Sequence, residues 1–487
     1  WLDFQNDVTV KDVGVAHQEG FRSVEHMKRY TTLGMATDQG KTANVPALAV
    51  MANLTGHSIA ETGTTIFRPP YTPVPLAAFA GRNAGKAFQP TRLTPSHDWS
   101  KSQGAVFVEA GQWLRPQWYP RAGENSWRDS VDREVIATRR SVGVSDVSSL
   151  GKIDVKGSDA AAFLDHIYTN TMSTLAVGKV RYGLMLREDG HVMDDGTVAR
   201  LGDNHFLVTT TTVNAGPVMA HLDYCHQVHW PEFDVSMVSV TDQFAQFAIA
   251  GPNARKVLEK LVDSNTKGGV DLSNDAFPFM ACSAMTVCGG VSARLYRISF
   301  SGELAYELAV GARYGDSMMR AIIEAGREFD IVPYGLEALN VMRIEKGHPV
   351  GSELNGQTTA ADLGMAKMVS AKKDCIGKVM AGRPGMTDPD REVLAGFKPV
   401  THDEELTAGA HFIGIGREAK TANDEGHMTS VCFSPSLGHS IGLGLIRRGH
   451  ERHGEKVRAV DSVRGRDVEV EICSPHFVDP AGERLRG

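Results

Sequence analysis

The first part of the chain carries apolar residues at the spacing of α-helices. These positions are Val13, Ala16, Phe21, Val24 and Met27. Thr9, three residues before Asp12, resembles a capping box, and Pro46 suits the first turn of a further helix that Gly56 would end. The pattern predicts a small helical domain over residues 1–66.

A proline-rich run follows the helical pattern. Residues 68–75 read Arg-Pro-Pro-Tyr-Thr-Pro-Val-Pro. Because proline fixes its own φ and disfavours helical backbone at the residue before it, this run predicts an extended connector. We therefore expect a domain boundary here and an extended linker region over residues 67–134.

From about Val135, short β-branched runs punctuated by glycine alternate with helical patterns. Residues 252–262 form an amphipathic helical pattern with proline in its first turn. The apolar runs 294–299 and 306–310 flank Ser-Gly-Glu and predict a hairpin, and a helix is expected over 314–329. Mixed helices and strands of this kind predict an α+β domain over residues 135–385.

Near Arg391 the pattern changes to short strands separated by glycines. The expected strands are 393–397, 429–432, 441–445, 457–460 and 468–473. They predict a small antiparallel β-barrel over residues 386–487. The fold class is therefore α+β, with a helical domain before it and a barrel after it.

Composition narrows the class of protein. The 487 residues are 42% hydrophobic and 22% charged, with 51 Lys and Arg against 58 Asp and Glu, as in ordinary globular proteins. Without a basic excess we expect no nucleic-acid partner. Without an apolar run of roughly 18 residues or a leader sequence, we expect no membrane segment and a cytoplasmic location. The chain begins at Trp1 rather than Met, which suggests a piece of a longer protein.

The cysteines and histidines do not predict a metal site. The six cysteines are scattered without a C-x-x-C pair, so reduced thiols are expected. Residues 225–229 read Cys-His-Gln-Val-His, but no second ligand pair at metal-site spacing accompanies them. We therefore predict no metal.

A glycine-rich loop spans residues 34–42. It differs from a P-loop because five residues rather than four separate Gly34 from Gly40, which disfavours nucleotide hydrolysis. Its backbone N–H groups and Lys41 could still receive a phosphate of another ligand. The other interpretation is a surface turn.

Two adjacent carboxylates, Asp194 and Asp195, follow a short apolar stretch. Asp195-Gly196 is common turn chemistry, so a simple turn explains the pair. A carboxylate here could instead orient an amine and stabilise positive charge. The residues alone leave both interpretations open.

The order of several motifs resembles the glycine-cleavage T-protein (aminomethyltransferase) family. The matching segments are 138–148 (TRRSVGVSDVS), 192–195 (VMDD), 250–254 (AGPNA), 302–307 (GELAYE), 335–338, 343–347 and 433–438. This resemblance implies a folate-binding domain from about Val135 to the end of the chain. Leu339 stands where the family has an arginine, and Phe300-Ser301 where it has Tyr-Thr.

The N-terminal part resembles the family of alpha subunits of heterotetrameric sarcosine oxidases, through segments 3–9, 23–26 and 29–42. The related helical domain is of a ferredoxin-like type, but no cysteine precedes Cys225 to hold an iron–sulfur cluster. The resemblance implies beta, gamma and delta subunits as partners, FMN at a subunit boundary, FAD in a partner subunit and NAD in a preceding nucleotide-binding half. It implies oxidation of sarcosine and capture of the one-carbon imine on tetrahydrofolate, which gives 5,10-methylenetetrahydrofolate, glycine and hydrogen peroxide.

The resemblance also implies roles for individual residues. Asp194 matches the catalytic aspartate, and the expected folate contacts are Glu307, then Glu303, with Thr211, Thr212 and Tyr306 as further candidates. Lys41 and Thr42 are the expected FMN contacts. The alternatives are a free aminomethyltransferase or related folate-dependent demethylase, and a folate-binding or assembly module without chemistry of its own.

Overall fold

The computed structural model describes residues 1–69, 72, 74–83, 85–87 and 90–487. The chain forms two compact units, Trp1–Pro90 and Thr91–Gly487. Of the proline-rich connector predicted over 68–75, Pro70, Tyr71 and Pro73 lie outside the described residues.

The smaller unit is helical, as predicted. Its elements are α1 (Val10–Gln18), α2 (Val24–Thr31), α3 (Asn44–Thr55), α4 (Ile59–Thr62), α5 (Leu76–Ala80) and the 3₁₀ turn η1 (Gly85–Ala87). Thr9 and Asp12 form the predicted capping box at the start of α1, and α3 ends at Gly56, whose φ of 73° is in the left-handed region that glycine adopts without strain. The apolar faces of α1, α2 and α3 pack into one core.

The predicted linker over 67–134 differs from the observed structure. The second unit begins at Thr91, and much of residues 92–134 is regular. The elements are β1 (Arg92–Leu93), α6 (His97–Ser102), β2 (Val106–Ala110), β3 (Trp113–Trp118) and α7 (Trp127–Arg140). β1, β3 and β2 form a small sheet in that order. The signals overlooked were the apolar residues on both sides of Gly111 and the capping box of Ser126 with Asp129.

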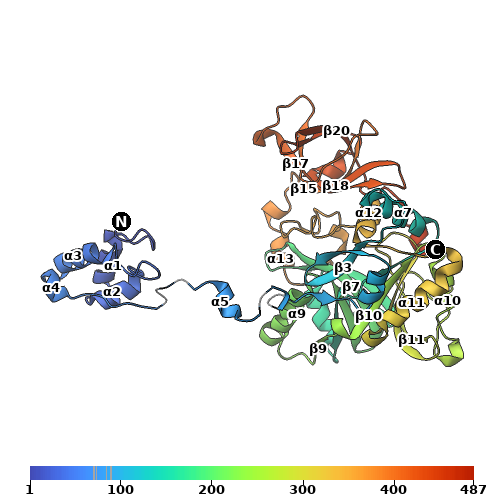
Figure 1. Ribbon diagram of the computed structural model, residues 1–487, viewed down its shortest axis with the longest axis horizontal. Coiled ribbons are helices and arrows are strands. Elements are labelled where there is room, and N and C mark those ends of the chain that lie inside the picture. Colours follow the sequence, from blue (N-terminus) through green and yellow to red (C-terminus); the bar gives the residue numbers. More distant parts are fainter. Residues whose placement is uncertain (70–71, 73, 84, 88–89) are drawn as a thin grey trace. The chain divides into compact units, whose positions relative to one another are not determined.

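Two larger sheets form the α+β part of the second unit (Figure 1). One has the order β11 (Cys282–Val287), β12 (Val291–Tyr296), β13 (Ala305–Gly311), β10 (Phe244–Ala250), β4 (Gly143–Asp146) and β14 (Val332–Pro333). The other has the order β6 (Lys179–Leu186), β7 (Val192–Gly202), β8 (His205–Thr210), β5 (Gly151–Lys156) and β9 (Ser236–Ser239). Because β4 and β5 are consecutive in the chain, residues 147–150 cross directly from one sheet to the other.

Helices complete this part of the unit. They are α8 (Ala160–Ile167), α9 (Ala215–Tyr224), α10 (Ala254–Glu259), α11 (Gly315–Gly326), α12 (Leu336–Lys346) and α13 (Lys378–Ala381). The predicted hairpin is confirmed, because β12 pairs antiparallel with β13. The predicted helices over 252–262 and 314–329 are present as the shorter α10 and α11.

The predicted antiparallel barrel is confirmed as a closed ring of six strands. In ring order they are β15 (Glu392–Pro399), β18 (His439–Arg447), β17 (Asp424–Ser434), β16 (His411–Gly414), β19 (Lys456–Asp461) and β20 (Arg466–Cys473). The sequence pattern missed β16, a four-residue strand whose pairing with β17 shifts in register. In Figure 1 the barrel, in orange to red, lies above α12 and α7.

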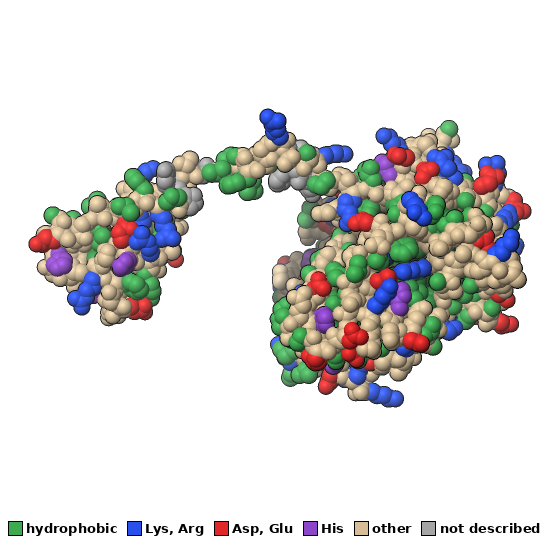
Figure 2. Space-filling model, turned by 90° about the horizontal axis from the view of Figure 1, so that it is seen from below, with side chains coloured by type: hydrophobic (Ala, Val, Ile, Leu, Met, Phe, Trp, Pro, Cys, Tyr) green, Lys and Arg blue, Asp and Glu red, His purple; other side chains and the backbone are tan. Residues whose placement is uncertain are grey.

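The last residues return from the barrel to the α+β part of the same unit. The backbone N–H groups of Phe477 and Val478 donate to the carbonyl of Glu345 at 2.9 and 2.8 Å. Lys346 forms an ion pair with Asp479 at 3.0 Å, and α14 (Glu483–Arg486) follows. The segment that follows the barrel is thus held to α12. On the face seen in Figure 2, acidic and basic side chains are interspersed.

Candidate functional site

Asp194 and Asp195 lie inside strand β7, so the interpretation of Asp195-Gly196 as a turn is wrong. Gly196 is needed for another reason: a Cβ there would lie 2.0 Å from the carbonyl oxygen of Thr209 on β8. The turn comes earlier, at Gly190, whose N–H donates to Arg187. Since side chains alternate along a strand, the two carboxylates point to opposite faces.

The Asp194 carboxylate is 1% exposed and is held by neutral donors. It accepts from the Thr211 hydroxyl at 2.8 Å, the Thr211 backbone N–H at 3.2 Å and the Asn214 amide at 3.0 Å. Burial raises its pKa, and these hydrogen bonds counteract part of the rise. No Lys, Arg or His nitrogen of the described residues forms an ion pair with it. Asp194 is thus an oriented carboxylate without a cation.

Asp195 has a separate partner. Its carboxylate accepts from the Tyr182 hydroxyl at 2.7 Å. Burial raises the pKa of Asp195 to about 6, and the nearby Asp194 charge adds to the rise. The two aspartates therefore differ in their surroundings, and only Asp194 is tied to the segment after β8.

Glu307, the first predicted folate contact, lies in the middle of β13, opposite Ala248 of β10. Its side chain is 9% exposed and accepts a hydrogen bond from the Gln246 amide. Burial raises its pKa, which the hydrogen bond and the charges of Lys152 and Arg115 counteract. Glu307 is a second buried carboxylate without an ion pair within 4.0 Å among the described residues.

Thr211 and Thr212 begin a polar connection from Asp194 toward the crossing between the two sheets. Thr211 donates to Asp194, and the Thr212 hydroxyl lies 3.1 Å from the Ser149 hydroxyl. Ser149 belongs to residues 147–150, which join β4 to β5. The two threonines that the sequence singled out therefore lie between Asp194 and this crossing.

The same crossing reaches Glu307 from its other side. The Ser148 hydroxyl accepts from the Gln246 backbone N–H at 2.9 Å, and the Gln246 side chain donates to Glu307. Polar contacts thus run from Asp194 through the crossing to Glu307. Sequence reasoning missed Ser148, Ser149 and Gln246, although Ser148 stands inside the T-protein-like motif of residues 138–148.

Lys152 fixes the crossing from within β5. It is 1% exposed, and its ammonium donates to the carbonyls of Ser148 at 2.8 Å and Leu150 at 2.7 Å. Burial lowers the pKa of Lys152 to about 8. A lysine between two apolar strand positions was the signal that sequence reasoning overlooked.

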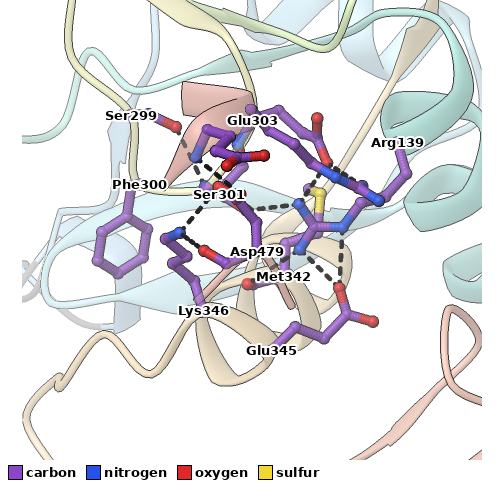
Figure 3. A network of polar contacts seen from close by, with 12 residues as sticks. Arg139, Ser299, Phe300, Ser301, Glu303, Met342, Glu345, Lys346 and Asp479 are labelled. Atoms are coloured by element: carbon purple, nitrogen blue, oxygen red, sulfur yellow. Dashed lines mark hydrogen bonds and ion pairs between the residues drawn. The ribbon is translucent and has the colours of Figure 1, made fainter. Parts of the chain in front are cut away.

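The structure does not bring Glu303 and Tyr306 to this connection. Figure 3 shows Arg139 between Glu303 and Glu345, at 2.8 and 2.6 Å, and Arg484 also reaches Glu303 at 3.0 Å. Tyr306 is fully buried, and its hydroxyl accepts from Arg255 at 3.0 Å. Glu303 therefore belongs to an ion-pair network and Tyr306 to the core.

Lys41 and Thr42 lie in the smaller unit and are exposed. The backbone N–H groups of Gly34, Asp38 and Lys41 already donate within that unit, to Asp3, Gln5 and Asp38. Three N–H groups of this loop are therefore already used, and the Lys41 side chain remains exposed. The Thr42 hydroxyl donates to Asp38 at 3.2 Å.

Several buried polar atoms near Glu307 and the two aspartates have no hydrogen-bond partner within the described residues. They are Arg115 Nε, Gln246 Oε1, the Tyr168 hydroxyl and Asn170 Oδ1. Gln246 contacts Glu307, and Asn170 donates to the carbonyl of Tyr182, the partner of Asp195. Because such groups are costly when left unpaired, they suit a ligand with its own donors and acceptors.

The described residues show neither a metal centre nor a membrane-spanning helix. They hold no group of three or more His, Cys, Asp or Glu placed to bind a metal ion. None of the helices described is long and apolar enough to cross a membrane. All six cysteines are free thiols.

Comparison with family models divides the chain into three matches. Residues 1–82 match the sarcosine oxidase A3 domain, 96–373 the GCVT N-terminal domain and 393–479 the glycine cleavage T-protein C-terminal barrel domain. The second match covers more than half of the chain. The three matches correspond to the helical unit, the two-sheet part and the barrel.

Similar proteins fall into two groups. The chain is 52% identical over 487 residues to the sarcosine oxidase subunit alpha of Rhizobium meliloti, covering 100% of this chain and 49% of the relative. The corresponding subunit of Corynebacterium sp. strain P-1 is 44% identical, with 100% and 50% covered. The chain thus spans about half the length of these relatives. The aminomethyltransferase of Chloroherpeton thalassium is 30% identical, covering 80% of this chain and 99% of that enzyme.

A solved structure shares the fold. The glycine cleavage system aminomethyltransferase T from Bartonella henselae superimposes with a TM-score of 0.67 at 22% identity, over 80% of this chain and 98% of that one. This likeness agrees with the α+β fold class predicted from the sequence.

Proposed function

The chain belongs to the glycine cleavage T-protein family and is homologous over its whole length to sarcosine oxidase alpha subunits, and from this premise we propose that it is the folate-binding part of such a subunit. In this proposal, sarcosine, tetrahydrofolate and O₂ give glycine, 5,10-methylenetetrahydrofolate and hydrogen peroxide. Flavin supplies the oxidation of the amine. The residues of this chain bind the folate and direct the transfer of the one-carbon unit.

The observation that carries the proposal is the environment of Asp194. An oriented carboxylate without a cation can stabilise the positive charge that develops when a pteridine nitrogen attacks the imine carbon. It can also accept the proton which that nitrogen then loses, and its raised pKa favours this role. Burial keeps water from hydrolysing the imine before capture.

Glu307 is the proposed anchor of the pteridine ring. A buried carboxylate accepts strongly from adjacent ring N–H and amino groups. The Gln246 amide and the nearby Lys152 charge would keep it ionised when the ligand is bound. Thr211 orients Asp194, and Thr212 ties this end of the site to the crossing.

Partners and further cofactors are part of the same proposal. The relatives' names support assembly with other subunits, for which we propose the beta, gamma and delta subunits of a heterotetramer. We place FMN at a subunit boundary near Lys41, held through that ammonium, with FAD in a partner subunit and NAD in a preceding half. The six free cysteines support a reducing compartment such as the cytoplasm.

Calorimetric titration of the isolated protein with tetrahydrofolate tests the proposal. We expect saturable binding at one site per chain, and Asp194→Asn should keep most of the binding while product formation falls. Absence of binding contradicts the proposal. Binding with no loss of methylenetetrahydrofolate in Asp194→Asn favours the non-catalytic module, and one-carbon transfer without partner subunits favours a free aminomethyltransferase.

A further inference from the structure

Arg115 is a buried arginine whose hydrogen-bonding groups are largely unused. It lies on β3, opposite Val108 of β2, and is 5% exposed. Nη2 donates to the backbone carbonyl of Asp146 at 3.0 Å, the single hydrogen bond of its side chain within the described residues, and Nε is buried without a partner. A guanidinium has five N–H donors in one plane, so most of this fork is available.

The contrast with Arg139 shows that the environment of Arg115 is unusual. Arg139 is similarly buried, yet its guanidinium donates to Glu303, to Glu345 and to the carbonyls of Ser301 and Met342. Arg115 makes no ion pair within 4.0 Å in the described part of the chain. Desolvation at such a position is costly unless another acceptor completes the hydrogen bonding.

The charges around Arg115 indicate which kind of acceptor is missing. The carboxylates of Asp146 and Glu307 act electrostatically on Arg115. The same two carboxylates, together with Asp242 and Arg115, act on the second cation, Lys152. Asp146 already accepts from Ser96 and from the Ser148 N–H. The two cations thus face three carboxylates, so a further anion would add to an existing excess of negative charge. A neutral oxygen, such as a ring carbonyl, would use the free donors without adding charge.

Arg115 and Glu307 approach the same strand, β10. Arg115 is bonded to the carbonyl of Asp146, and the next residue, Val147, donates through its N–H to the Gln246 carbonyl at 2.8 Å. The Gln246 side chain donates to Glu307. The two side chains are also close enough for the Arg115 charge to counteract the rise in the pKa of Glu307.

We propose that Arg115 donates to the ring carbonyl oxygen of the bound pteridine while Glu307 accepts from the adjacent ring N–H, so that Arg115 selects an oxo-pteridine over its 4-amino analogue. This inference rests on the proposed function. The reduced pteridine of tetrahydrofolate presents an amino group and a ring N–H as donors, next to a carbonyl acceptor. The 4-amino analogue replaces that acceptor with a donor, which would face the guanidinium and leave it unpaired.

The test is a comparison of two ligands, tetrahydrofolate and its 4-amino-4-deoxy derivative, by calorimetry on the protein as isolated with its co-purifying subunits. The parent protein should prefer tetrahydrofolate by roughly ten- to a hundredfold, the range of a charged hydrogen bond. Arg115→Met should bind tetrahydrofolate more weakly by about that factor and bind the 4-amino derivative as the parent does. The ratio of the two affinities then comes close to one. Arg115→Lys, which keeps the charge and a donor, should retain part of the preference.

The matched control is Arg297→Met. Arg297 is fully buried and donates to the carbonyls of Phe277 and Arg486, so its loss should lower stability and leave the affinity ratio unchanged. An equal loss of affinity for both ligands in Arg115→Met leaves the ratio of the two affinities unchanged. That result overturns the inference while the proposed function stands. If Arg115→Met does not fold, Arg115→Lys with an unchanged ratio overturns it equally. If the parent protein binds neither ligand, the proposed function fails and this inference with it.

Discussion

Buried carboxylates occur in two regions of the larger unit, and the two regions hold them differently. Glu303 and Glu345 share Arg139, and Glu303 also has Arg484. Asp194 and Glu307 instead accept from hydroxyl, amide and N–H groups, and their pKa values are raised by burial. We call the region of Glu303 and Glu345 the paired region and the region of Asp194 and Glu307 the neutral region.

The two arrangements suit different roles, because one stabilises the fold and the other suits ligand binding and proton transfer. In the paired region every charge has an opposite charge, and the ion pairs join the hairpin tip, α7, α12 and the C-terminal segment. In the neutral region the carboxylates retain the capacity to accept protons, and nearby polar atoms remain unpaired. A site that binds a ligand and moves a proton needs the second arrangement.

The largest expected effect is in the paired region. Arg139→Met leaves Glu303 and Glu345 buried without their cation, so we expect a loss of about 3–5 kcal/mol in the free energy of unfolding. Denaturant unfolding followed by circular dichroism measures it. The control is Arg448→Met, which removes an exposed pair with Glu451 and should change the free energy of unfolding far less. A similar small loss in both variants would contradict the distinction between the regions.

Replacing one glutamate by glutamine in each region compares the two regions directly. Glu307→Gln should weaken tetrahydrofolate binding by about 1.5–3 kcal/mol, because a charged hydrogen bond to the ring is lost, with little effect on the unfolding midpoint. Glu303→Gln should do the reverse, since it leaves Arg139 and Arg484 partly unpaired. Calorimetric titration and thermal unfolding of both variants give the two readings. Unchanged folate affinity in Glu307→Gln would remove Glu307 from the site.

A smaller effect concerns pH. Burial raises the pKa of Asp195 to about 6, above its unfolded value, so its favourable contribution to stability is present at low pH and lost as pH rises through 6. Between pH 5 and 8 the parent protein should lose about 1.4 kcal/mol relative to Asp195→Asn. Unfolding of both proteins at the two pH values measures this. Parallel pH profiles would mean that Asp195 is not a buried, cation-free carboxylate.

The smallest expected effect lies outside both regions. Lys41→Met should reduce, without abolishing, the flavin retained by the assembled complex after gel filtration, because a single exposed ammonium contributes modestly to phosphate binding. Lys11→Met, an exposed lysine on α1, is the control. Full flavin retention in Lys41→Met would favour the interpretation of residues 34–42 as a surface turn.

Local patterns predicted much of the fold. The capping box of Thr9 and Asp12, the hairpin around residue 302 and the barrel strands depend on residues close in sequence, and all are present. The sheet of residues 92–118 was missed because its strands are short and interrupted by Gly111 and Pro116, so their alternation is weak.

The site was harder to predict, because its residues come together through contacts that are distant in the sequence. Motifs pointed to Asp194, Thr211 and Glu307, but the contacts that join them link residues about 60 to 100 positions apart. Glu303 was placed at the site because it lies in the same motif as Glu307. Its partner Arg139 is 164 residues away in sequence, and no local pattern reveals that pairing.

The central claim is that Asp194 directs the one-carbon unit to folate, and the fate of that unit tests it most directly. Asp194→Asn and Asp195→Asn are compared in the assembled enzyme with sarcosine and saturating tetrahydrofolate, while hydrogen peroxide, methylenetetrahydrofolate and formaldehyde are measured together. In Asp194→Asn we expect peroxide at the parental rate, methylenetetrahydrofolate reduced about a hundredfold and formaldehyde in its place, as for loss of a catalytic proton acceptor. Asp195→Asn should keep the parental products. Parental methylenetetrahydrofolate formation in Asp194→Asn would contradict the account.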